Sequence, residues 1–224
     1  MKKAIVLLSG GLDSAVTLYL AKKQKFQCHC LTFNYHQRHR REIESARAIA
    51  HKAGCAIIIE NISLPRKGSA LLDTHLRIPR LHPQRERVSE YIPTTYVPAR
   101  NIIFLSFALS FAETEKAKAL FIGAHSEDYS GYPDCRPAFY RAFQRVIDCG
   151  TKAGVEHKGI KVVTPLLHKS KAEIIRLGSK LGVPFGLSWS CYRGGESPCG
   201  KCDSCYYRHK GFQEAGINDP LITR

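Results

Sequence analysis

The sequence predicts an α/β fold, a Rossmann-like parallel sheet with helices on both faces, joined to a small C-terminal metal-binding segment. Three observations support this prediction. Short apolar segments alternate with segments of helical periodicity, a glycine-rich loop follows the first apolar segment, and four cysteines lie within fifteen residues near the C-terminus. Alternation of this kind is typical of a parallel sheet whose ligand crevice lies at the carboxyl ends of the strands.

The first half of the chain alternates strand and helix signals. Short apolar runs predict strands, and apolar residues at helical spacing predict the helices between them; Gly54 supplies a residue that can end the second helix. In chain order the predicted elements are a strand over Ala4–Leu8, a helix over Ala15–Lys23, a strand over Cys28–Tyr35, a helix carrying Ile43, Ala46, Ala50 and Ala53, and a strand over Cys55–Ile59.

The regular pattern resumes after an interruption. Residues 65–98 contain five prolines and many Arg and His, so we expect an irregular insertion that folds over a ligand. The elements predicted after it are a helix over Ile102–Thr114, a strand over Ala119–Gly123, a helix over Pro137–Val146, a strand over Ile160–Val163, and a helix from the capping box at Ser170 to Leu181, just before Gly182.

Length and composition limit the function classes. The chain has 224 residues, 44% of them hydrophobic and 24% charged, which fits one globular domain over residues 1–186 with a small segment over 187–224. No apolar run approaches the ~20 residues of a membrane span, and Ser9-Gly10-Gly11 interrupts the only stretch that imitates a signal peptide. We therefore expect a cytoplasmic protein with no membrane partner.

The net charge of +15 favours anionic ligands. Such an excess of Lys and Arg attracts nucleotides or RNA, although a solvated basic surface has the same composition. Charge alone does not distinguish between ATP and tRNA as the partner.

The loop Ser9-Gly10-Gly11-Leu12-Asp13-Ser14, flanked by Leu8 and Ala15, lies between the first strand and the first helix. Its glycines permit close approach of the backbone to an anion, its serines offer hydroxyl donors, and the helix start offers free N–H groups. The spacing fits neither a Walker loop nor a dinucleotide fingerprint. The alternative is an ordinary glycine-rich turn.

Four cysteines near the C-terminus have the spacing of a metal site. Cys191, Cys199, Cys202 and Cys205 form C-x7-C-x2-C-x2-C. Four thiolates close a tetrahedral site, so we expect one structural Zn²⁺; an iron–sulfur cluster uses the same ligands and is the alternative.

The Ser-Gly-Gly-x-Asp-Ser loop resembles the pyrophosphate loop of the ATP-pyrophosphatase superfamily. The resemblance implies an adenine nucleotide alpha hydrolase-like sheet, ATP bound through its β,γ-phosphates at Leu8–Ala15, and adenylation as the chemistry. Asp13 would then help to hold Mg²⁺ at the triphosphate, because hard cations bind carboxylate and phosphate oxygens. Its alternative role is that of an acidic residue at a helix start.

Further stretches along nearly the whole chain resemble the 7-cyano-7-deazaguanine synthase family. They are Phe33-Asn34-Tyr35-His36-Gln37-Arg38-His39, Val97-Pro98-Ala99-Arg100-Asn101, Asp128-Tyr129-Ser130-Gly131-Tyr132-Pro133-Asp134-Cys135-Arg136, Thr164-Pro165-Leu166, Ser190-Cys191-Tyr192 and the run from Cys199 to Cys205. This chain departs from the family at His36, where glycine is usual, and at Ala99, where many members have glycine.

The resemblance implies conversion of 7-carboxy-7-deazaguanine and ammonia into the nitrile by two successive adenylations, as a step toward queuosine. In this interpretation Arg100, Arg38 and His39 stabilise developing charge, with Arg100 the first choice. Asp128 and Asp134 would accept hydrogen bonds from the deazapurine edge, with Tyr132 or Phe33 stacking on the ring. The alternatives are basic residues at helix starts and ordinary turn residues.

The expected partners are ATP, free or delivered ammonia and a small deazapurine, without direct nucleic-acid binding; a homodimer is left open. Two other hypotheses remain at this point. One is a tRNA-thiolating enzyme of the same superfamily, which the charge and the cysteines also suit. The other is a zinc-ribbon nucleic-acid-binding module without catalysis, which leaves the phosphate loop unexplained.

Overall fold

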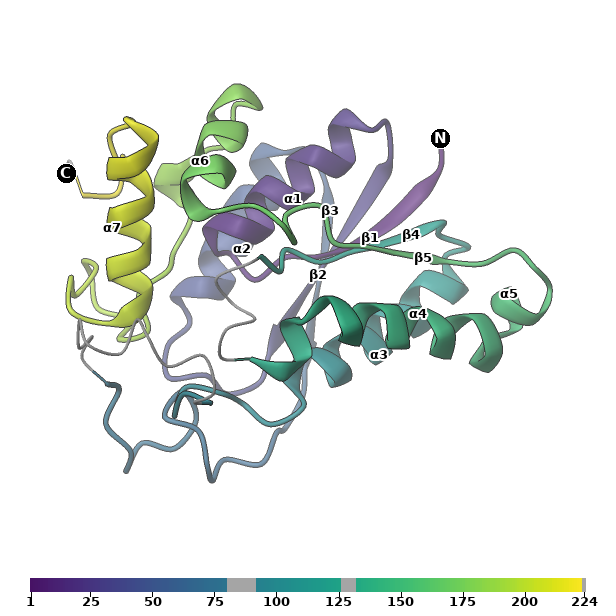
Figure 1. Cartoon of the computed structure of the whole chain (residues 1–224), viewed down its shortest axis with the longest axis horizontal. Helices are drawn as coiled ribbons and strands as arrows, with labels where there is room; N and C mark the ends of the chain where they lie inside the picture. Colours follow the sequence, from purple (N-terminus) through teal and green to yellow (C-terminus); the bar gives the residue numbers. More distant parts are fainter. Residues whose placement is uncertain (80–91, 126–131, 223–224) are drawn as a thin grey trace.

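A five-stranded parallel sheet forms the centre of the molecule (Figure 1). The computed structural model describes residues 1–79, 92–125 and 132–222. The strand order is β3-β2-β1-β4-β5, which confirms the predicted α/β class. The strands are β1 (Lys3–Leu7), β2 (Gln27–Asn34), β3 (Ala56–Asn61), β4 (Ala119–Phe121) and β5 (Lys161–Val163).

Helices cover both faces of the sheet because alternate residues of each strand are buried on opposite sides. Ala4 and Val6 of β1 pack against α1 (Leu12–Lys23), α2 (Arg41–Lys52) and α6 (Lys171–Lys180). Ile5 and Leu7 pack on the other face, against α3 (Arg100–Thr114) and α4 (Pro137–Gly150). A strand buried on both faces has no polar side, which explains the unbroken apolar run at the N-terminus.

The strand order places a switch point beside β1. The chain moves outward from β1 through β2 to β3, and then returns to place β4 on the other side of β1. In open α/β sheets, ligands bind outside the carboxyl ends of the strands at such a point. The loop at Ser9–Ser14 follows β1 directly and therefore lies there.

Most helix predictions are confirmed, with three differences. The Ser170 hydroxyl accepts the backbone N–H of Glu173, and the Glu173 carboxylate accepts that of Ser170, which completes the predicted capping box of α6. Helix α4 continues to Gly150, beyond the predicted end at Val146. It is followed by a short helix α5 (Lys152–Val155), which was not predicted. The structure also contains 3-10 turns η2 (Pro133–Cys135) and η3 (Phe185–Leu187).

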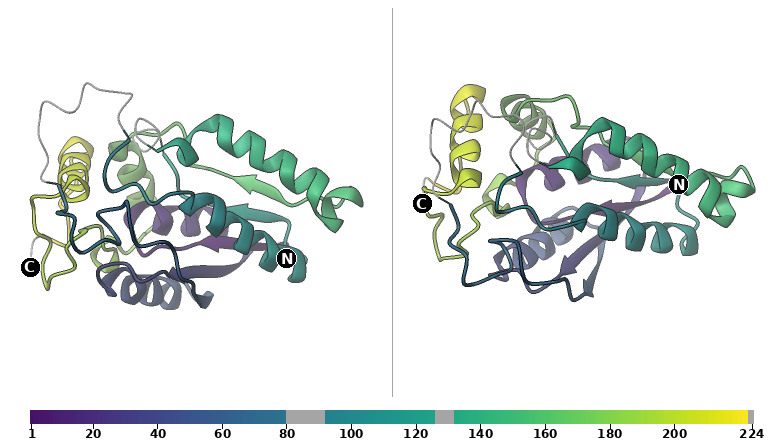
Figure 2. Two further views of the ribbon diagram at one scale, coloured as in Figure 1. Left: turned by 90° about the horizontal axis from the view of Figure 1, so that it is seen from below. Right: turned by 60° about the horizontal axis from the view of Figure 1, so that its bottom comes forward.

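Helix α7 (Asp203–Ala215) was not predicted either. Its sequence carries Gly211 and two adjacent tyrosines, which are weak helix formers, and lacks a clear apolar period. The stability of α7 therefore comes from packing against α6 and not from local helix propensity. Figures 1 and 2 place α7 at the carboxyl ends of the strands, at the opposite end of the molecule from the N-terminus.

A buried ion pair and its neighbouring hydrogen bonds attach α7 to the segments that precede and follow it. The Arg208 guanidinium donates to both carboxylate oxygens of Asp219 at 2.6 and 2.8 Å. The same group donates to the Ser188 hydroxyl at 2.8 Å and to the Phe185 carbonyl at 3.1 Å. Arg208 and Asp219 are both buried, so each charge depends on the other for compensation.

None of the helices in the described ranges combines the length and apolarity needed to cross a bilayer.

Replacing Arg208 by Ala should lower the free energy of unfolding by about 3 to 5 kcal/mol, because Asp219 is then left as a buried, unpaired charge. Urea denaturation measures the loss. Arg176→Ala is the matched control: Arg176 lies on α6 and donates to the carbonyl of the exposed Glu214. The control should change stability by no more than about 0.5 kcal/mol. Equal midpoints of urea denaturation for the two variants would contradict a stabilising role of the Arg208–Asp219 ion pair.

Candidate active site

A cavity of about 280 Å³ opens at the carboxyl ends of the strands. It is lined by the loop after β1, the end of β2, the starts of α2 and α3, the segment after β4 and the segment around residue 189. The structure therefore brings together residues that are far apart in the sequence. The predicted site residues that line it are Leu8, Ser9, Gly11, Leu12, Asp13, Ser14, Phe33, Arg38, His39, Arg100 and Tyr132.

Three other predicted site residues do not line the cavity, and a fourth cannot be placed. Gly10, Ala15 and Asp134 lie next to lining residues without lining the cavity themselves. Asp128 lies outside the described residues.

The loop after β1 is held open by its own hydrogen bonds. Ser9 and Ser14 join their hydroxyls at 3.1 Å, Ser14 also donates to the Gly11 carbonyl at 2.9 Å, and the Gly11 N–H donates to Ser9 at 3.3 Å. Helix α1 then begins at Leu12, and no side chain caps it. Its first N–H groups and positive dipole end thus face the cavity, which suits an anion.

The two glycines of the loop have different tasks. Gly10 has φ +86°, and a Cβ there would lie 2.1 Å from the Glu42 carbonyl oxygen. Its own carbonyl accepts the Trp189 N–H at 2.9 Å. Gly11 has an ordinary φ of −78°, and a Cβ there would meet only the Ser9 hydroxyl, at 3.3 Å, and the Trp189 carbonyl, at 3.7 Å. Gly10 is therefore needed for packing, whereas Gly11 lets the backbone approach a ligand.

Asp13 forms an ion pair beside the loop. Lys171 donates to its two carboxylate oxygens at 2.9 and 2.8 Å, and the His125 Nε2 lies 3.5 Å from one of them. Burial raises the pKa of Asp13, but Lys171 and His125 together outweigh burial and hold that pKa well below its usual range. Asp13 is therefore an anion at neutral pH.

Sequence reasoning missed Lys171 and His125, which lie 2.8 Å apart. Lys171 is the first residue of α6, where a cation opposes the helix dipole. That local conflict was a signal that Lys171 has a partner elsewhere. His125 follows β4 without such a signal.

Arg100 begins α3 and lies against acidic and aromatic groups. Burial lowers the pKa of Arg100, but Tyr35 and then Cys135, Tyr132 and Asp134 raise it above its ordinary value. Arg100 also hydrogen-bonds Tyr35. The guanidinium is thus a fixed cation in the cavity.

Glu42, at the start of α2, also lines the cavity and was not predicted. Burial raises the pKa of Glu42 to about 7, although Arg100 partly lowers it. Recognising it from sequence requires knowing that α2 packs against the loop, which a local pattern does not contain.

Asp134 supports the start of α3. Its carboxylate accepts the Asn101 N–H at 3.0 Å, and its carbonyl accepts the Asn101 side-chain amide at 3.2 Å. This buried carboxylate thus helps to position Arg100, the neighbour of Asn101.

The predicted aromatic residues already have protein contacts. Phe33 stacks on Phe104 with ring centroids 4.1 Å apart. The Tyr132 hydroxyl shares a hydrogen bond of 2.8 Å with Thr95, which belongs to the 65–98 segment.

Arg38 and His39 connect the site to more distant segments. The Arg38 guanidinium donates to the carbonyls of Asp73, at 2.6 Å, and Leu76, so it attaches residues 73–76 to the cavity wall. In the described parts of that segment there is no helix or strand. The His39 ring lies edge-on to Trp189, with centroids 6.4 Å apart.

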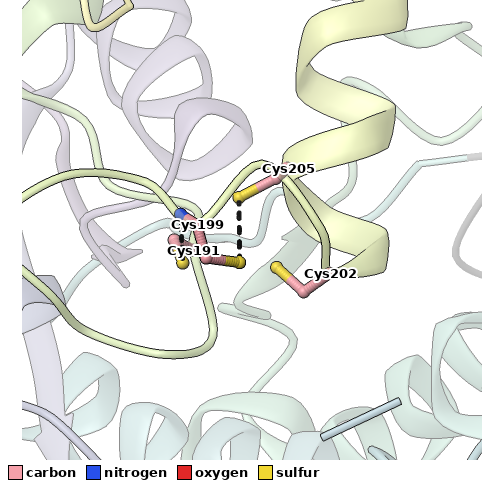
Figure 3. A group of neighbouring side chains, drawn as sticks. All are labelled: Cys191, Cys199, Cys202 and Cys205. Carbon is pink, nitrogen blue, oxygen red and sulfur yellow. Dashed lines mark hydrogen bonds between the residues drawn. The ribbon is translucent and has the colours of Figure 1, made fainter. Parts of the chain in front are cut away.

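The four C-terminal cysteines gather at one point (Figure 3). Their sulfur atoms all lie within 4.8 Å of one another, and those of Cys199 and Cys205 are 4.0 Å apart. Zn–S bonds of about 2.3 Å in a tetrahedron place sulfurs about 3.8 Å apart, so the group fits a metal ion. The Cys191 sulfur accepts N–H groups from Arg193 and Cys199 at 3.4 Å each, as thiolate ligands do.

Comparison with protein families gives one match over nearly the whole chain. Residues 3–216 match the model of the queuosine biosynthesis protein QueC. A 7-cyano-7-deazaguanine synthase 2 from Desulfitobacterium hafniense is 52% identical over 225 residues, covering 99% of this chain and 93% of that protein. A 7-cyano-7-deazaguanine synthase from Trichodesmium erythraeum is 50% identical, covering 98% and 100%.

A solved structure shares the fold at low identity. The predicted subunit of a tRNA methyltransferase from Methanocaldococcus jannaschii is 16% identical, with a TM-score of 0.51 over 98% of this chain and 90% of that one. This likeness supports the fold alone.

Replacing Lys171 by Met should destabilise the protein at pH 6 more than at pH 3. The pKa of Asp13 is lowered in the folded state, so its ion pair stabilises the fold above the unfolded-state pKa of about 3.9 and loses this effect as the pH falls through the folded-state value. Urea denaturation at the two pH values measures the difference. Lys180→Met, at the exposed end of α6, is the control. An equal loss at both pH values would rule out Asp13 as the partner that matters.

Proposed function

The chain belongs to the QueC family of queuosine biosynthesis proteins, and from this premise we propose that it converts 7-carboxy-7-deazaguanine, ammonia and two ATP into 7-cyano-7-deazaguanine, two AMP and two pyrophosphates. The observation that carries the proposal is that the loop after β1 and Arg100 face the same cavity. One cavity thus offers a place for a triphosphate and a fixed cation for charge that develops beside it.

The chemistry requires activation at two points. Ammonia does not displace oxide from a carboxylate, so the carboxylate oxygen first attacks the α-phosphorus of ATP and pyrophosphate leaves. Ammonia then replaces AMP and gives the amide. The amide still carries one oxygen, and a second adenylation turns that oxygen into a leaving group as the nitrile forms.

The loop is proposed to hold the β- and γ-phosphates. The N–H groups at the start of α1 and the hydroxyls of Ser9 and Ser14 are the donors. The α-phosphorus is then exposed toward Arg100, which stabilises charge on the phosphate and on the oxygen of the attacked carbon. Arg38 and His39 add further basic side chains to the cavity lining, and Arg38 also binds the Asp73 carbonyl.

Mg²⁺ fits this arrangement through Asp13. The Asp13 Oδ1 atom accepts a hydrogen bond from Lys171 and keeps a further lone pair. When bound, Mg²⁺ neutralises phosphate charge. Lys171 donates to both oxygens of the Asp13 carboxylate and so fixes its orientation whether or not the metal is bound.

The deazapurine is proposed to lie beside Tyr132, whose hydroxyl is fixed by Thr95, and beside the Phe33–Phe104 pair. Asp134 acts through Arg100, since its carboxylate holds the start of α3. Ammonia is free or is delivered by a partner. Direct nucleic-acid binding is not part of the proposal, and a homodimer is left open.

The cysteine cluster is proposed to hold one structural Zn²⁺. Four protein ligands leave no open position for a reacting water. The metal would fix the segment that carries Trp189. The backbone N–H of Trp189 donates to the Gly10 carbonyl in the loop.

Replacing Gly11 by Val should reduce ATP affinity by about tenfold or more while the fold stays intact, because the new side chain enters the cavity without meeting backbone at close range. Isothermal titration with ATP measures the change, and circular dichroism monitors the fold. Gly159→Val, in the loop before β5, is the matched control. Unchanged affinity in the Gly11 variant would refute the loop assignment.

The amide 7-amido-7-deazaguanine should give the nitrile from one ATP without ammonia, because its nitrogen is already in place. The carboxylate should need ammonia and two ATP. Chromatography of nucleotides and bases follows both reactions. Formation of ADP and phosphate would contradict an exposed α-phosphorus, and AMP formation with tRNA alone would favour the thiolating alternative.

Protein purified in air should contain one zinc per chain and no iron. Cys202→Ser should lose the metal and unfold at lower temperature, since binding of a structural metal contributes to folding. Elemental analysis and thermal melting measure these effects, with the exposed Cys149→Ser as control. Stoichiometric iron with visible absorbance would overturn the zinc assignment.

A further inference from the structure

Glu42 places a carboxyl group between the phosphate loop and Arg100. Its backbone carbonyl packs against Gly10, where a Cβ would be only 2.1 Å away. Its side chain lines the cavity and lies close enough to the Arg100 guanidinium to be influenced by it. A triphosphate held at the loop would bring its α-phosphorus toward this carboxyl group.

Two carboxylates line the cavity among the described residues, Asp13 and Glu42. Asp13 is committed to Lys171, and its lowered pKa makes it a weak base. No lysine lines the cavity beside Glu42 among the described residues. The titratable or charged groups that share the cavity with Glu42 are Asp13, Tyr35, Arg38, His39, Arg100, Tyr132, Cys135 and Tyr192.

The proposed reaction releases protons from nitrogen at three points. When ammonia forms a C–N bond to the acyl adenylate, nitrogen loses one proton while AMP leaves with the electron pair of the C–O bond. When the amide oxygen attacks the second ATP, pyrophosphate leaves and nitrogen loses its second proton, giving an imidate adenylate. Loss of the last N–H proton forms the C≡N bond as AMP departs. The first adenylation releases no proton, because the carboxylate oxygen attacks with its own lone pair.

We propose that Glu42 is the general base that accepts these three protons from nitrogen and passes each to solvent. The inference rests on the proposed function. The position beside Arg100 suits the role. The reacting carbon carries both the oxygen whose negative charge Arg100 stabilises and the nitrogen that loses its protons, so a base must lie close to Arg100.

The acidity of Glu42 fits this task. Burial raises the pKa of its carboxyl group to about 7, with Arg100 opposing the rise. A base titrating near the working pH accepts a proton and returns it to solvent readily.

The test separates adenylation from the steps that release protons. Glu42→Gln should keep pyrophosphate–ATP exchange with 7-carboxy-7-deazaguanine in the absence of ammonia, within about threefold of the unaltered protein. It should lose nitrile formation by about 10² to 10⁴, the usual contribution of a general base. Glu42→Asp should recover part of that loss.

Glu44→Gln is the matched control, because Glu44 lies on the same helix with its side chain exposed and should leave both rates unchanged. With 7-amido-7-deazaguanine as the substrate, which needs no ammonia, the unaltered protein should lose nitrile formation about tenfold per pH unit below pH 7, as Glu42 is protonated, and Glu42→Gln should lack this dependence. Thermal melting and zinc content confirm that each variant is folded.

Three outcomes would overturn the inference. Full nitrile formation by Glu42→Gln shows that no base is lost, and a parallel loss of exchange and nitrile formation in a folded variant shows that Glu42 serves binding. Absence of exchange in the unaltered protein would refute the proposed function itself, before any Glu42 variant is made.

Discussion

The ion pair between Asp13 and Lys171 connects the phosphate loop to the rest of the molecule. Lys171 begins α6, and α7 packs directly over its aliphatic stem: a Cβ at Gly211 would lie 2.3 Å from the Lys171 Cγ. Helix α7 in turn carries Arg208, which holds Ser188 beside Trp189, and the Trp189 N–H returns to the loop at Gly10. These contacts lead from the loop through α6 and α7 back to the loop. Because Cys205 lies on α7 and the Trp189 indole donates to the Cys191 carbonyl, the positions of the loop and of the cysteine cluster depend on each other.

Strained backbone accompanies the two turns that bring basic residues to the cavity. His36 precedes Arg38 and has φ +61°, and Ala99 precedes Arg100 and has φ +54°. Both are departures from glycine within the family resemblance described above. A left-handed conformation at such residues costs about 1 to 2 kcal/mol each. The surrounding contacts therefore hold the turns in place, among them the Arg38 bonds to the 65–98 segment and the Asp134 bond to Asn101.

Sequence reasoning predicted the elements whose causes are local. The five strands, the loop after β1 and the cysteine group each follow from residues that are close in the chain, and the structure contains all three. It did not predict α7, whose stability comes from α6, nor the roles of His125, Lys171 and Glu42. These side chains reach the site only because the sheet order brings their elements to β1. For Asp134 the local pattern suggested a turn or a ligand contact, whereas its bond to Asn101 depends on the fold.

The central claim is that one cavity adenylates two successive oxygen atoms of the same substrate. Oxygen-18 in both positions of the carboxylate tests it most directly, because each adenylation bonds a substrate oxygen to phosphorus, and the C–O bond then breaks as AMP leaves with that oxygen. The account predicts one labelled oxygen in each of the two AMP molecules and none in pyrophosphate, measured by mass spectrometry. Label in pyrophosphate, or one labelled oxygen released as water, would contradict it.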